Sequence, residues 1–217
     1  MTGENLKRRT PYVITVISIV ILGAFVLLLY PQFKAKKERP ARETGQQISN
    51  SGTASSKRLD KLMRSLGIQK MGKDVAAPDF ELDNLDGKKV RLKDYRGKII
   101  LLNFMATWCH WCRKEMPSLQ KLYEQFKDQD FVIVAVFSDR EGARAVVPFV
   151  EKSGYTFFGD SGLLDPTGRV DTLYGITGTP TSYLINREGK MIGREIGYRD
   201  WFTQGTRDLI EGLLKSK

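Results

Sequence analysis

The sequence predicts a three-layer α/β domain that follows a single transmembrane helix. Two short apolar runs, residues 99–105 (apolar except for Asn103) and 131–137, are typical of buried parallel strands. Between them, residues 109–127 repeat apolar side chains at helical spacing. Alternating strands and helices place helices on both faces of a sheet, which gives three layers. Ahead of these elements, residues 12–30 carry no charge and have the length of a membrane span.

The apolar segment YVITVISIVILGAFVLLLY, residues 12–30, is 19 residues long. As a helix it would extend about 28 Å, close to the thickness of the hydrocarbon core of a bilayer. A cleaved secretory signal has a shorter apolar region followed by small residues, whereas PQFK follows here. Tyr12 and Tyr30, at the two edges, suit the membrane interfaces. We therefore predict an uncleaved signal anchor.

The formal net charge of +10 is unevenly distributed along the chain. Residues 1–72 hold 13 basic and 4 acidic side chains, which leaves 22 basic and 21 acidic ones for residues 73–217. Because the C-terminal part is nearly neutral, its charge gives no support for a nucleic-acid partner. The positive excess flanks the apolar segment and therefore indicates a lipid bilayer as the partner.

Four segments are predicted: a basic N-terminal segment (1–11), the transmembrane anchor (12–30), a polar tether (31–72) and the α/β domain (73–217). The tether contains GQQISNSGTASS and lacks sustained apolar periodicity, as expected for a flexible linker. Within it, residues 57–68 form a short amphipathic pattern. That pattern predicts either a helix packed on the domain or one lying on the membrane surface.

The domain carries further local signals in order along the chain. Residues 78–98 predict a β-hairpin with its turn at Asp86-Gly87. A helix is expected over residues 143–153. The remaining expected elements are strands at 181–185 and 191–196, which bracket a turn at 186–189, and an amphipathic helix at 201–214.

The chemistry of the chain is expected at Cys109 and Cys112, its only two cysteines. A zinc site needs about four ligands, and the single histidine, His110, lies between the cysteines. A purely structural disulfide across two residues would close a very short loop and stabilise little. A redox-active pair is the favoured interpretation, and it requires no metal and no cofactor.

The position of the pair supports redox chemistry. The strand at residues 99–105 leads directly to the start of a helix, so Cys109 is expected at that helix's N-terminus. Unpaired N–H groups and the helix dipole there favour a thiolate. Such a thiolate can attack a substrate disulfide, and Cys112 can then attack Cys109 to release the reduced product.

Three longer motifs surround these residues: APDFELDNLDGKKVRLKDYRGK, LLNFMATWCHWCRKEMP and YGITGTPTSYLINREGK. In them the chain resembles the membrane-anchored thioredoxin-like proteins of the TlpA/ResA/DsbE type. The resemblance implies a thioredoxin fold with an N-terminal hairpin and a strand–helix insertion between Cys112 and Pro180. It also implies reduction of protein disulfides, with apocytochrome c maturation as one expected role and a membrane thiol protein as the electron donor.

The resemblance assigns roles to a proline loop. Pro180, in Gly178-Thr179-Pro180-Thr181, matches the family proline whose preceding peptide bond is cis. In the family this loop faces the cysteine pair and offers backbone groups to the substrate, so Thr179 and Pro180 are predicted substrate-binding residues. An ordinary turn is the alternative.

Glu115 matches the acidic residue of the family pattern C-x-x-C-x-x-E, and we expect it to raise the thiol pKa or to move a proton. A solvated glutamate that pairs with Lys114 is the alternative. Asn103, which cannot titrate, occupies the position of a buried aspartate in thioredoxin. This substitution makes Glu115 the evident candidate acid.

The two residues between the cysteines, His110 and Trp111, depart from the commoner family dipeptide. His110, if charged, would stabilise the Cys109 thiolate and tune the reduction potential. Trp108 and Trp111 are predicted to contact substrate, with packing as the alternative for each.

Two further functions compete with the reductase. A thiol peroxidase shares the early motif and the fold but needs a threonine three residues before its cysteine, where this chain has Ala106. A membrane-tethered peptide-binding module without turnover is the other.

The side of the membrane is a separate question. Three basic residues precede the anchor and five follow it within twelve residues, and this count alone would leave the domain in the cytoplasm. The count applies to short loops, and a long domain follows here. Because a redox disulfide pair favours an oxidising compartment, we expect a single-pass cell-membrane protein with an extracytoplasmic domain.

Overall fold

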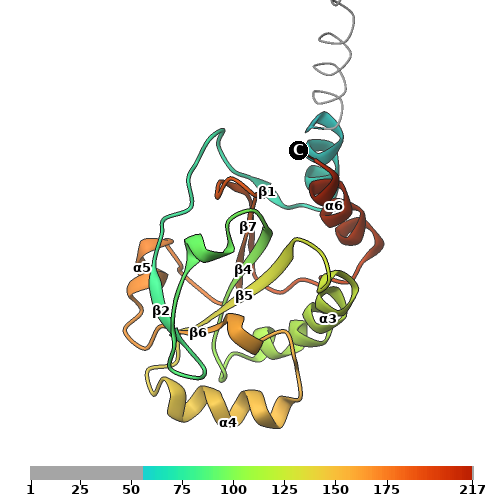
Figure 1. Cartoon of the computed structure of the whole chain (residues 1–217). Coiled ribbons are helices and arrows are strands. Elements are labelled where there is room, and N and C mark those ends of the chain that lie inside the picture. Colours follow the sequence, from blue (N-terminus) through green and yellow to red (C-terminus); the bar gives the residue numbers. More distant parts are fainter. Residues whose placement is uncertain (1–55, 217) are drawn as a thin grey trace, which may run out of the picture. The chain divides into compact units, whose positions relative to one another are not determined.

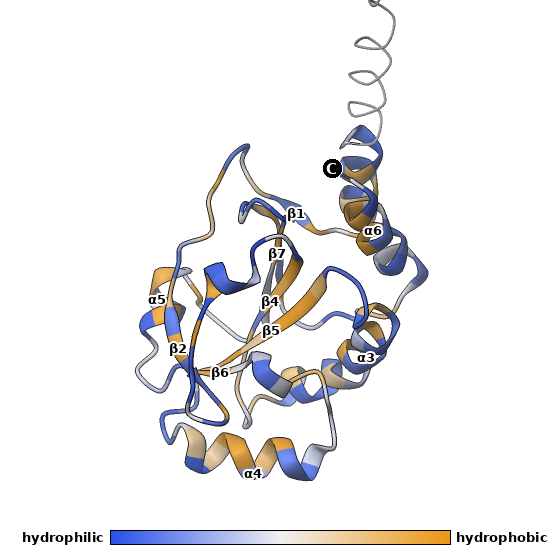
Figure 2. Cartoon of the chain, viewed as in Figure 1, coloured by the Kyte–Doolittle hydropathy of each residue, from blue (hydrophilic) through white to orange (hydrophobic). Residues whose placement is uncertain are grey.

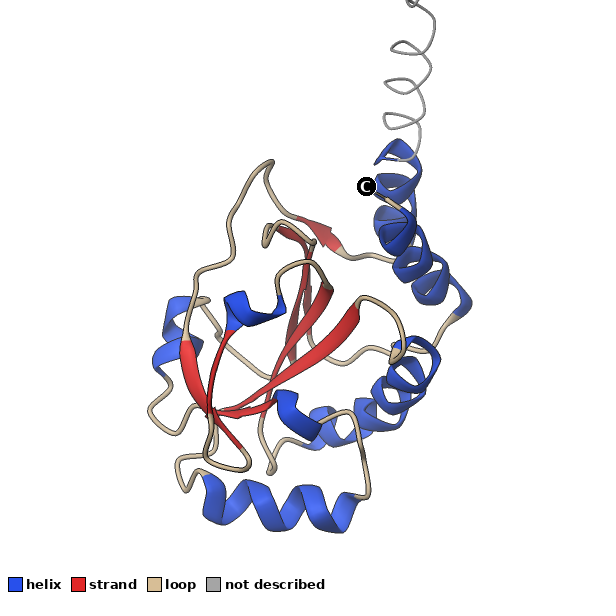
Figure 3. Ribbon diagram, viewed as in Figure 1, coloured by secondary structure: helices blue, strands red, loops and turns tan. Residues whose placement is uncertain are grey.

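An eight-stranded mixed sheet forms the centre of the structure, a computed structural model that describes residues 56–216 (Figures 1 and 3). The strands are β1 (Gln69–Lys70), β2 (Glu81–Asn84), β3 (Lys89–Arg91), β4 (Ile99–Met105), β5 (Phe131–Phe137), β6 (Gly162–Leu164), β7 (Thr181–Ile185) and β8 (Met191–Ile196). Their order across the sheet is β1-β8-β7-β4-β5-β6-β2-β3. β4, β5 and β6 pair in parallel, and the other neighbours are antiparallel.

Helices cover both faces of this sheet. They are α3 (His110–Phe126), α4 (Ala143–Ser153), α5 (Arg169–Leu173), α6 (Gln204–Lys215) and the 3₁₀ turns η1 (Leu92–Tyr95) and η2 (Gly159–Ser161). Buried side chains of α3, α4 and α6 belong to one core cluster, whereas α5 and η1 contribute to the other. The predicted three-layer α/β architecture is therefore confirmed.

The central strand β4 feeds both clusters because successive side chains point to opposite faces. Ile99, Leu101 and Met105 pack in the α3 cluster, and Ile100, Leu102 and Phe104 in the α5 cluster. Figure 2 shows β4 and β5 as apolar strands, as expected for strands covered on both faces. Asn103 is the polar exception in β4 and is fully buried.

Most predicted elements lie where the local patterns placed them. The β2–β3 hairpin turns at Gly87, which has φ +77°, and Gly154 ends α4 in the left-handed conformation. The interval between Cys112 and Pro180 contains β6 and α5, where a strand–helix insertion was expected. The last helix begins at Gln204 instead of 201, because the Thr203 hydroxyl accepts the Thr206 N–H and caps it.

The packed unit begins before residue 73. Residues 56–65 are helical, and Met63 is buried against the α3 cluster. Gly205 and Gly212 in α6 leave space for Leu66 and Leu59, since a Cβ at either glycine would clash with them. Strand β1 then pairs with β8. Of the two predictions for residues 57–68, packing on the domain is confirmed, so these residues belong to the packed unit.

The predicted segments 1–11 and 12–30, and most of the tether, lie outside the described residues. Within residues 56–216, no helix combines the length and apolar character needed to cross a membrane.

Candidate active site

The two cysteines form a disulfide at the start of α3. β4 ends at Met105, and the short turn after it places Cys109 at the N-cap of the helix. The backbone N–H of Cys112 donates to Cys109 Sγ, with 3.1 Å between the two atoms. Cys112 is completely buried, whereas Cys109 is 6% exposed. The helix therefore stabilises negative charge on the more accessible sulfur.

The proline loop lies against this sulfur. The Thr179–Pro180 peptide bond is cis, as the resemblance implied. The carbonyl oxygen of Thr179 lies 3.6 Å from Cys109 Sγ, although 70 residues separate the two in the chain. The pairing of β7 beside β4 brings the loop to this position. The loop therefore faces the cysteine pair, as the resemblance implied, while its substrate-binding role stays a prediction.

Glu115 is buried, not solvated. It lies on the inner face of α3, three residues after Cys112, and is 1% exposed. Its Oε1 accepts a hydrogen bond from Asn103 Nδ2 at 2.8 Å, and its Oε2 accepts a longer one from Trp201 Nε1 at 3.4 Å. The expected alternative, a surface glutamate paired with Lys114, is therefore wrong.

Burial raises the pKa of Glu115 from 4.5 to about 7. Hydrogen bonds from Asn103, from the backbone of Arg199 and from Trp201 oppose this rise in pKa, and the nearby charge of Glu195 adds to it. Every one of these hydrogen-bond partners is a donor. The surroundings therefore suit a carboxylate, while desolvation favours the protonated acid, and such a group can exchange protons near neutral pH.

Asn103 connects the acid to the proline loop. Its Nδ2 also donates to the hydroxyl of Ser182, at 2.8 Å, and Ser182 is its register partner in β7. Its Oδ1 is buried without a hydrogen-bond partner. Sequence reasoning missed both Ser182 and Trp201. The position of Ser182, two residues after Pro180, would have pointed to it once the pairing of β7 with β4 was assumed.

The turn that leads to Cys109 is held by a buried carboxylate. Asp139, which follows β5, accepts the N–H of Thr107 at 3.0 Å and its hydroxyl at 2.5 Å. Asp139 is 1% exposed, so the contact is shielded from water. The Thr107 hydroxyl donates to Asp139 and is therefore not directed at Cys109. In a thiol peroxidase site the threonine hydroxyl would be directed at the reactive cysteine.

The geometry agrees with the proteins that this chain resembles. The family model described as the AhpC/TSA family matches residues 74–193. Thiol-disulfide oxidoreductase ResA of Bacillus thuringiensis (strain Al Hakam) is 37% identical over 147 residues, which cover 68% of this chain and 79% of that protein. The ResA of Bacillus subtilis (strain 168) is 37% identical over 126 residues, covering 58% and 68%.

Among solved structures, a putative thiol:disulfide interchange protein DsbE from Chlorobium tepidum is 31% identical with a TM-score of 0.59, covering 66% of this chain and 99% of that one. The chain belongs to the AhpC/TSA family, among its TlpA/ResA/DsbE-type thiol–disulfide oxidoreductases. Its fold is thioredoxin-like and its activity is that of an enzyme, so the non-enzymatic binding module is excluded.

In this ResA-type oxidoreductase the aromatic residues around the cysteines are exposed. Trp108 is 68% exposed and Trp111 is 51% exposed, so neither serves as a core residue. His110 is also exposed, and its ring meets that of Trp111 edge to face at 5.3 Å. All three side chains are therefore accessible to a substrate that approaches Cys109.

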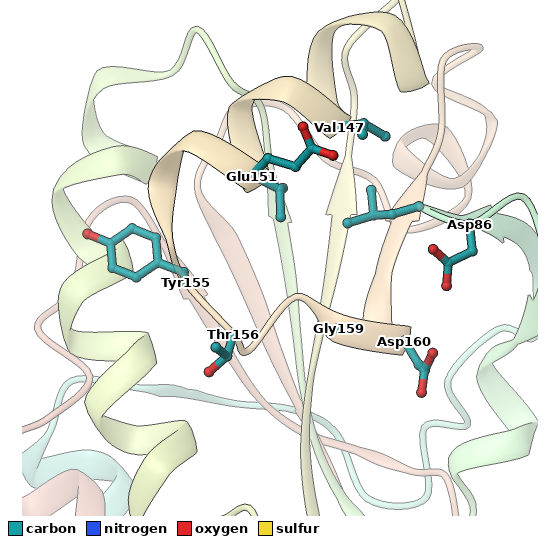
Figure 4. A pocket seen from close by; sticks show the side chains of 9 residues that line it. Asp86, Val147, Glu151, Tyr155, Thr156, Gly159 and Asp160 are labelled. Atoms are coloured by element: carbon teal, nitrogen blue, oxygen red, sulfur yellow. The ribbon is translucent and has the colours of Figure 1, made fainter.

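A separate surface pocket of about 510 Å³ lies between the β2–β3 turn, α4 and η2 (Figure 4). It is lined by Leu85, Asp86, Val147, Val150, Glu151, Tyr155, Thr156, Gly159 and Asp160. None of the predicted site residues lines it, so the redox site of the oxidoreductase is not this pocket.

Proposed function

We propose that this oxidoreductase is anchored in the cell membrane and reduces protein disulfides outside the cytoplasm. One observation carries the reductase part: Cys109, the more exposed of the two cysteines, lies at a helix N-terminus beside the Thr179 carbonyl and is paired with a fully buried Cys112. This asymmetry gives the two sulfurs different tasks.

In the reduced protein, the Cys109 thiolate attacks one sulfur of a substrate disulfide. The substrate S–S bond breaks, a mixed disulfide forms and the first substrate thiolate leaves. Cys112 then loses its proton and attacks Cys109 Sγ, which closes the Cys109–Cys112 disulfide and releases the second substrate thiolate. The dithiol has supplied two electrons, and a membrane thiol protein restores it.

Glu115 is the proposed acceptor of the Cys112 proton. It lies one helical turn after Cys112 on the same buried face, and its pKa of about 7 suits exchange near neutral pH. His110 tunes the couple, since positive charge beside a thiolate stabilises the reduced form. Trp108, Trp111, Thr179 and Pro180 form the substrate-binding surface.

The uncharged segment 12–30 supports the membrane anchor, and a redox-active disulfide supports a location outside the reducing cytoplasm. Apocytochrome c is the proposed substrate within the wider class of protein disulfides, on the strength of the family resemblance.

Trapping experiments test the roles given to Cys109 as the attacking thiol and Cys112 as the resolving thiol. Cys112→Ser should accumulate mixed disulfides with substrate proteins, because nothing resolves them, whereas Cys109→Ser should accumulate none. Equal trapping by the two variants would contradict the roles given to the sulfurs. The accompanying activity measurement is the reduction of insulin by a dithiol. The wild-type protein should catalyse this reaction, and neither variant should.

Topology is tested on intact cells. After mild reduction, a membrane-impermeant maleimide should label Cys109 in the Cys112→Ser variant without lysis. Labelling only after lysis would place the domain in the cytoplasm and remove the extracytoplasmic role, while leaving the oxidoreductase activity intact.

A further inference from the structure

Exposed apolar side chains gather around the redox disulfide. Across residues 56–216, the large apolar side chains with high exposure are Trp108, Trp111, Leu173, Ile196 and Tyr198. Two of them flank Cys109 in the chain. Ile196 and Tyr198 flank Gly197, whose N–H donates to the Pro180 carbonyl at 2.8 Å. Four of the five therefore border the same site, and such a concentration of exposed apolar surface marks an interaction surface.

Part of this surface is an ordered cluster of two rings and a cation. The rings of Trp111, from α3, and Tyr198, from the loop after β8, lie 5.9 Å apart at 44°. The Lys114 ammonium lies 4.9 Å from the Trp111 ring centroid and 5.0 Å from that of Tyr198. Both distances are within the range of cation–π attraction, which holds the ammonium beside both rings.

The charge of this ammonium is not neutralised by a neighbouring acid. In the described part of the chain Lys114 forms no ion pair, and neither does the adjacent, exposed Arg113. The one acid in the first two turns of α3, Glu115, is buried. By contrast, Arg199, the residue after Tyr198, is mostly buried and pairs with Glu195 at 2.6 Å. The charge that contacts both rings, the Lys114 ammonium, is therefore exposed and positive.

We propose that Trp111, Lys114 and Tyr198 form a specificity subsite for polypeptides that carry an apolar and an acidic side chain next to the disulfide cysteine. This rests on the proposed disulfide reduction and specifies its substrates. The apolar side chain lies on the two rings, and the carboxylate pairs with the Lys114 ammonium, which retains N–H donors that the ring faces do not use.

The ion pair between the substrate carboxylate and Lys114 would be exposed to solvent, and this exposure sets the size of its effect on the rate. An exposed ion pair at a preorganised cation should change the rate of attack on the substrate by about threefold, and reversal of the charge by about tenfold. Added salt should reduce both effects, because exposed charges are screened.

Single-turnover reduction of three synthetic peptides tests the subsite. The peptides share one intramolecular disulfide and differ beside the first cysteine, where they carry Leu-Glu, Leu-Lys or Ser-Gln. Pre-reduced full-length protein in detergent micelles supplies both electrons. Variants Lys114→Gln, Lys114→Glu and Tyr198→Ser are compared with Lys121→Glu. Lys121 is an exposed lysine two turns further along α3. Lys121→Glu therefore makes the same charge change as Lys114→Glu, but away from the rings.

Wild type should reduce the Leu-Glu peptide faster than the Leu-Lys peptide. Lys114→Gln should abolish the difference, and Lys114→Glu should reverse it. Tyr198→Ser should slow both Leu peptides relative to the Ser-Gln peptide, while Lys121→Glu should behave as wild type.

Equal rates for all peptides, with normal reduction of hydroxyethyl disulfide, would overturn the subsite and leave the proposed function in place. Failure to reduce any of these disulfides would overturn the proposed function and the subsite with it.

Discussion

The Asn103 side-chain amide donates a hydrogen bond to the Glu115 carboxylate, with 2.8 Å between Nδ2 and Oε1. Both residues are buried, one in the strand that leads to Cys109 and the other in the helix that follows it. Since an asparagine cannot ionise, this contact leaves Glu115 as the single titrating carboxyl group of the pair. Of these two contacting side chains, only Glu115 should therefore titrate.

The first prediction concerns stability as a function of pH. Folding raises the pKa of Glu115 from 4.5 to about 7, so between these values the folded protein holds a proton that the unfolded chain has released. The stabilising contribution is therefore complete below about pH 4.5 and declines as the pH rises towards 7, by about 3 kcal/mol in all.

Urea titrations of the oxidised full-length protein in micelles, at several pH values, measure this decline. Glu115→Gln should lack it, because glutamine does not titrate. Wild type and variant are compared by the slope of the free energy of unfolding with pH and not by its absolute value. The absolute value would also change, because the NH₂ group of the introduced glutamine would face hydrogen-bond donors. An identical slope in wild type and variant would assign the decline to other groups.

The second prediction concerns the reactivity of Cys109. Above pH 7 the Glu115 carboxylate is charged and disfavours a second negative charge close by. Glu115→Gln should therefore lower the pKa of Cys109 and simplify the pH profile of alkylation, because one of the coupled titrating groups is removed. The measurement is iodoacetamide alkylation of the reduced protein, and superimposable profiles would show that the carboxylate does not reach the sulfur.

The third prediction concerns Asn103→Leu, which keeps the number and branching of the side-chain heavy atoms and removes the amide. Its hydrogen bond lowers the pKa of Glu115, so its loss should raise that pKa further. The midpoint of the Glu115 carboxyl resonance, followed by ¹³C NMR, should move to higher pH. Ser182→Ala removes only the hydroxyl that accepts from Asn103 and should move it less. A midpoint unchanged in Asn103→Leu would contradict this role of the amide.

The fourth prediction concerns the contact between Asp139 and Thr107. Asp139→Ala leaves the Thr107 N–H and hydroxyl without their acceptor in a shielded position, so the free energy of unfolding should fall by about 1–3 kcal/mol. Insulin reduction should slow as well, because the turn before Cys109 loses its anchor. Asp128→Ala, at an exposed aspartate, is the control and should change neither quantity. Wild-type activity in Asp139→Ala would limit the contact to stability.

Elements with a strong local pattern were predicted almost to the residue. The runs 99–105 and 131–137 became β4 and β5, because short runs that are apolar on both strand faces are stable only when both faces are covered. The start of α6 was less predictable. Apolar periodicity continues back to Trp201, but the cap at Thr203 decides where the helix begins.

By itself the sequence determined the redox pair: the C-x-x-C spacing and the strand–helix junction that places Cys109 at a helix N-terminus both depend on residues close together in the chain. Only the tertiary structure decided the properties of its surroundings. Enclosure by β4 and Trp201 desolvates Glu115 and so sets its pKa, and the pairing of β7 beside β4 brings Thr179 to Cys109. The physical reason is that desolvation and contact between distant segments arise only when the chain packs, and no local pattern encodes them.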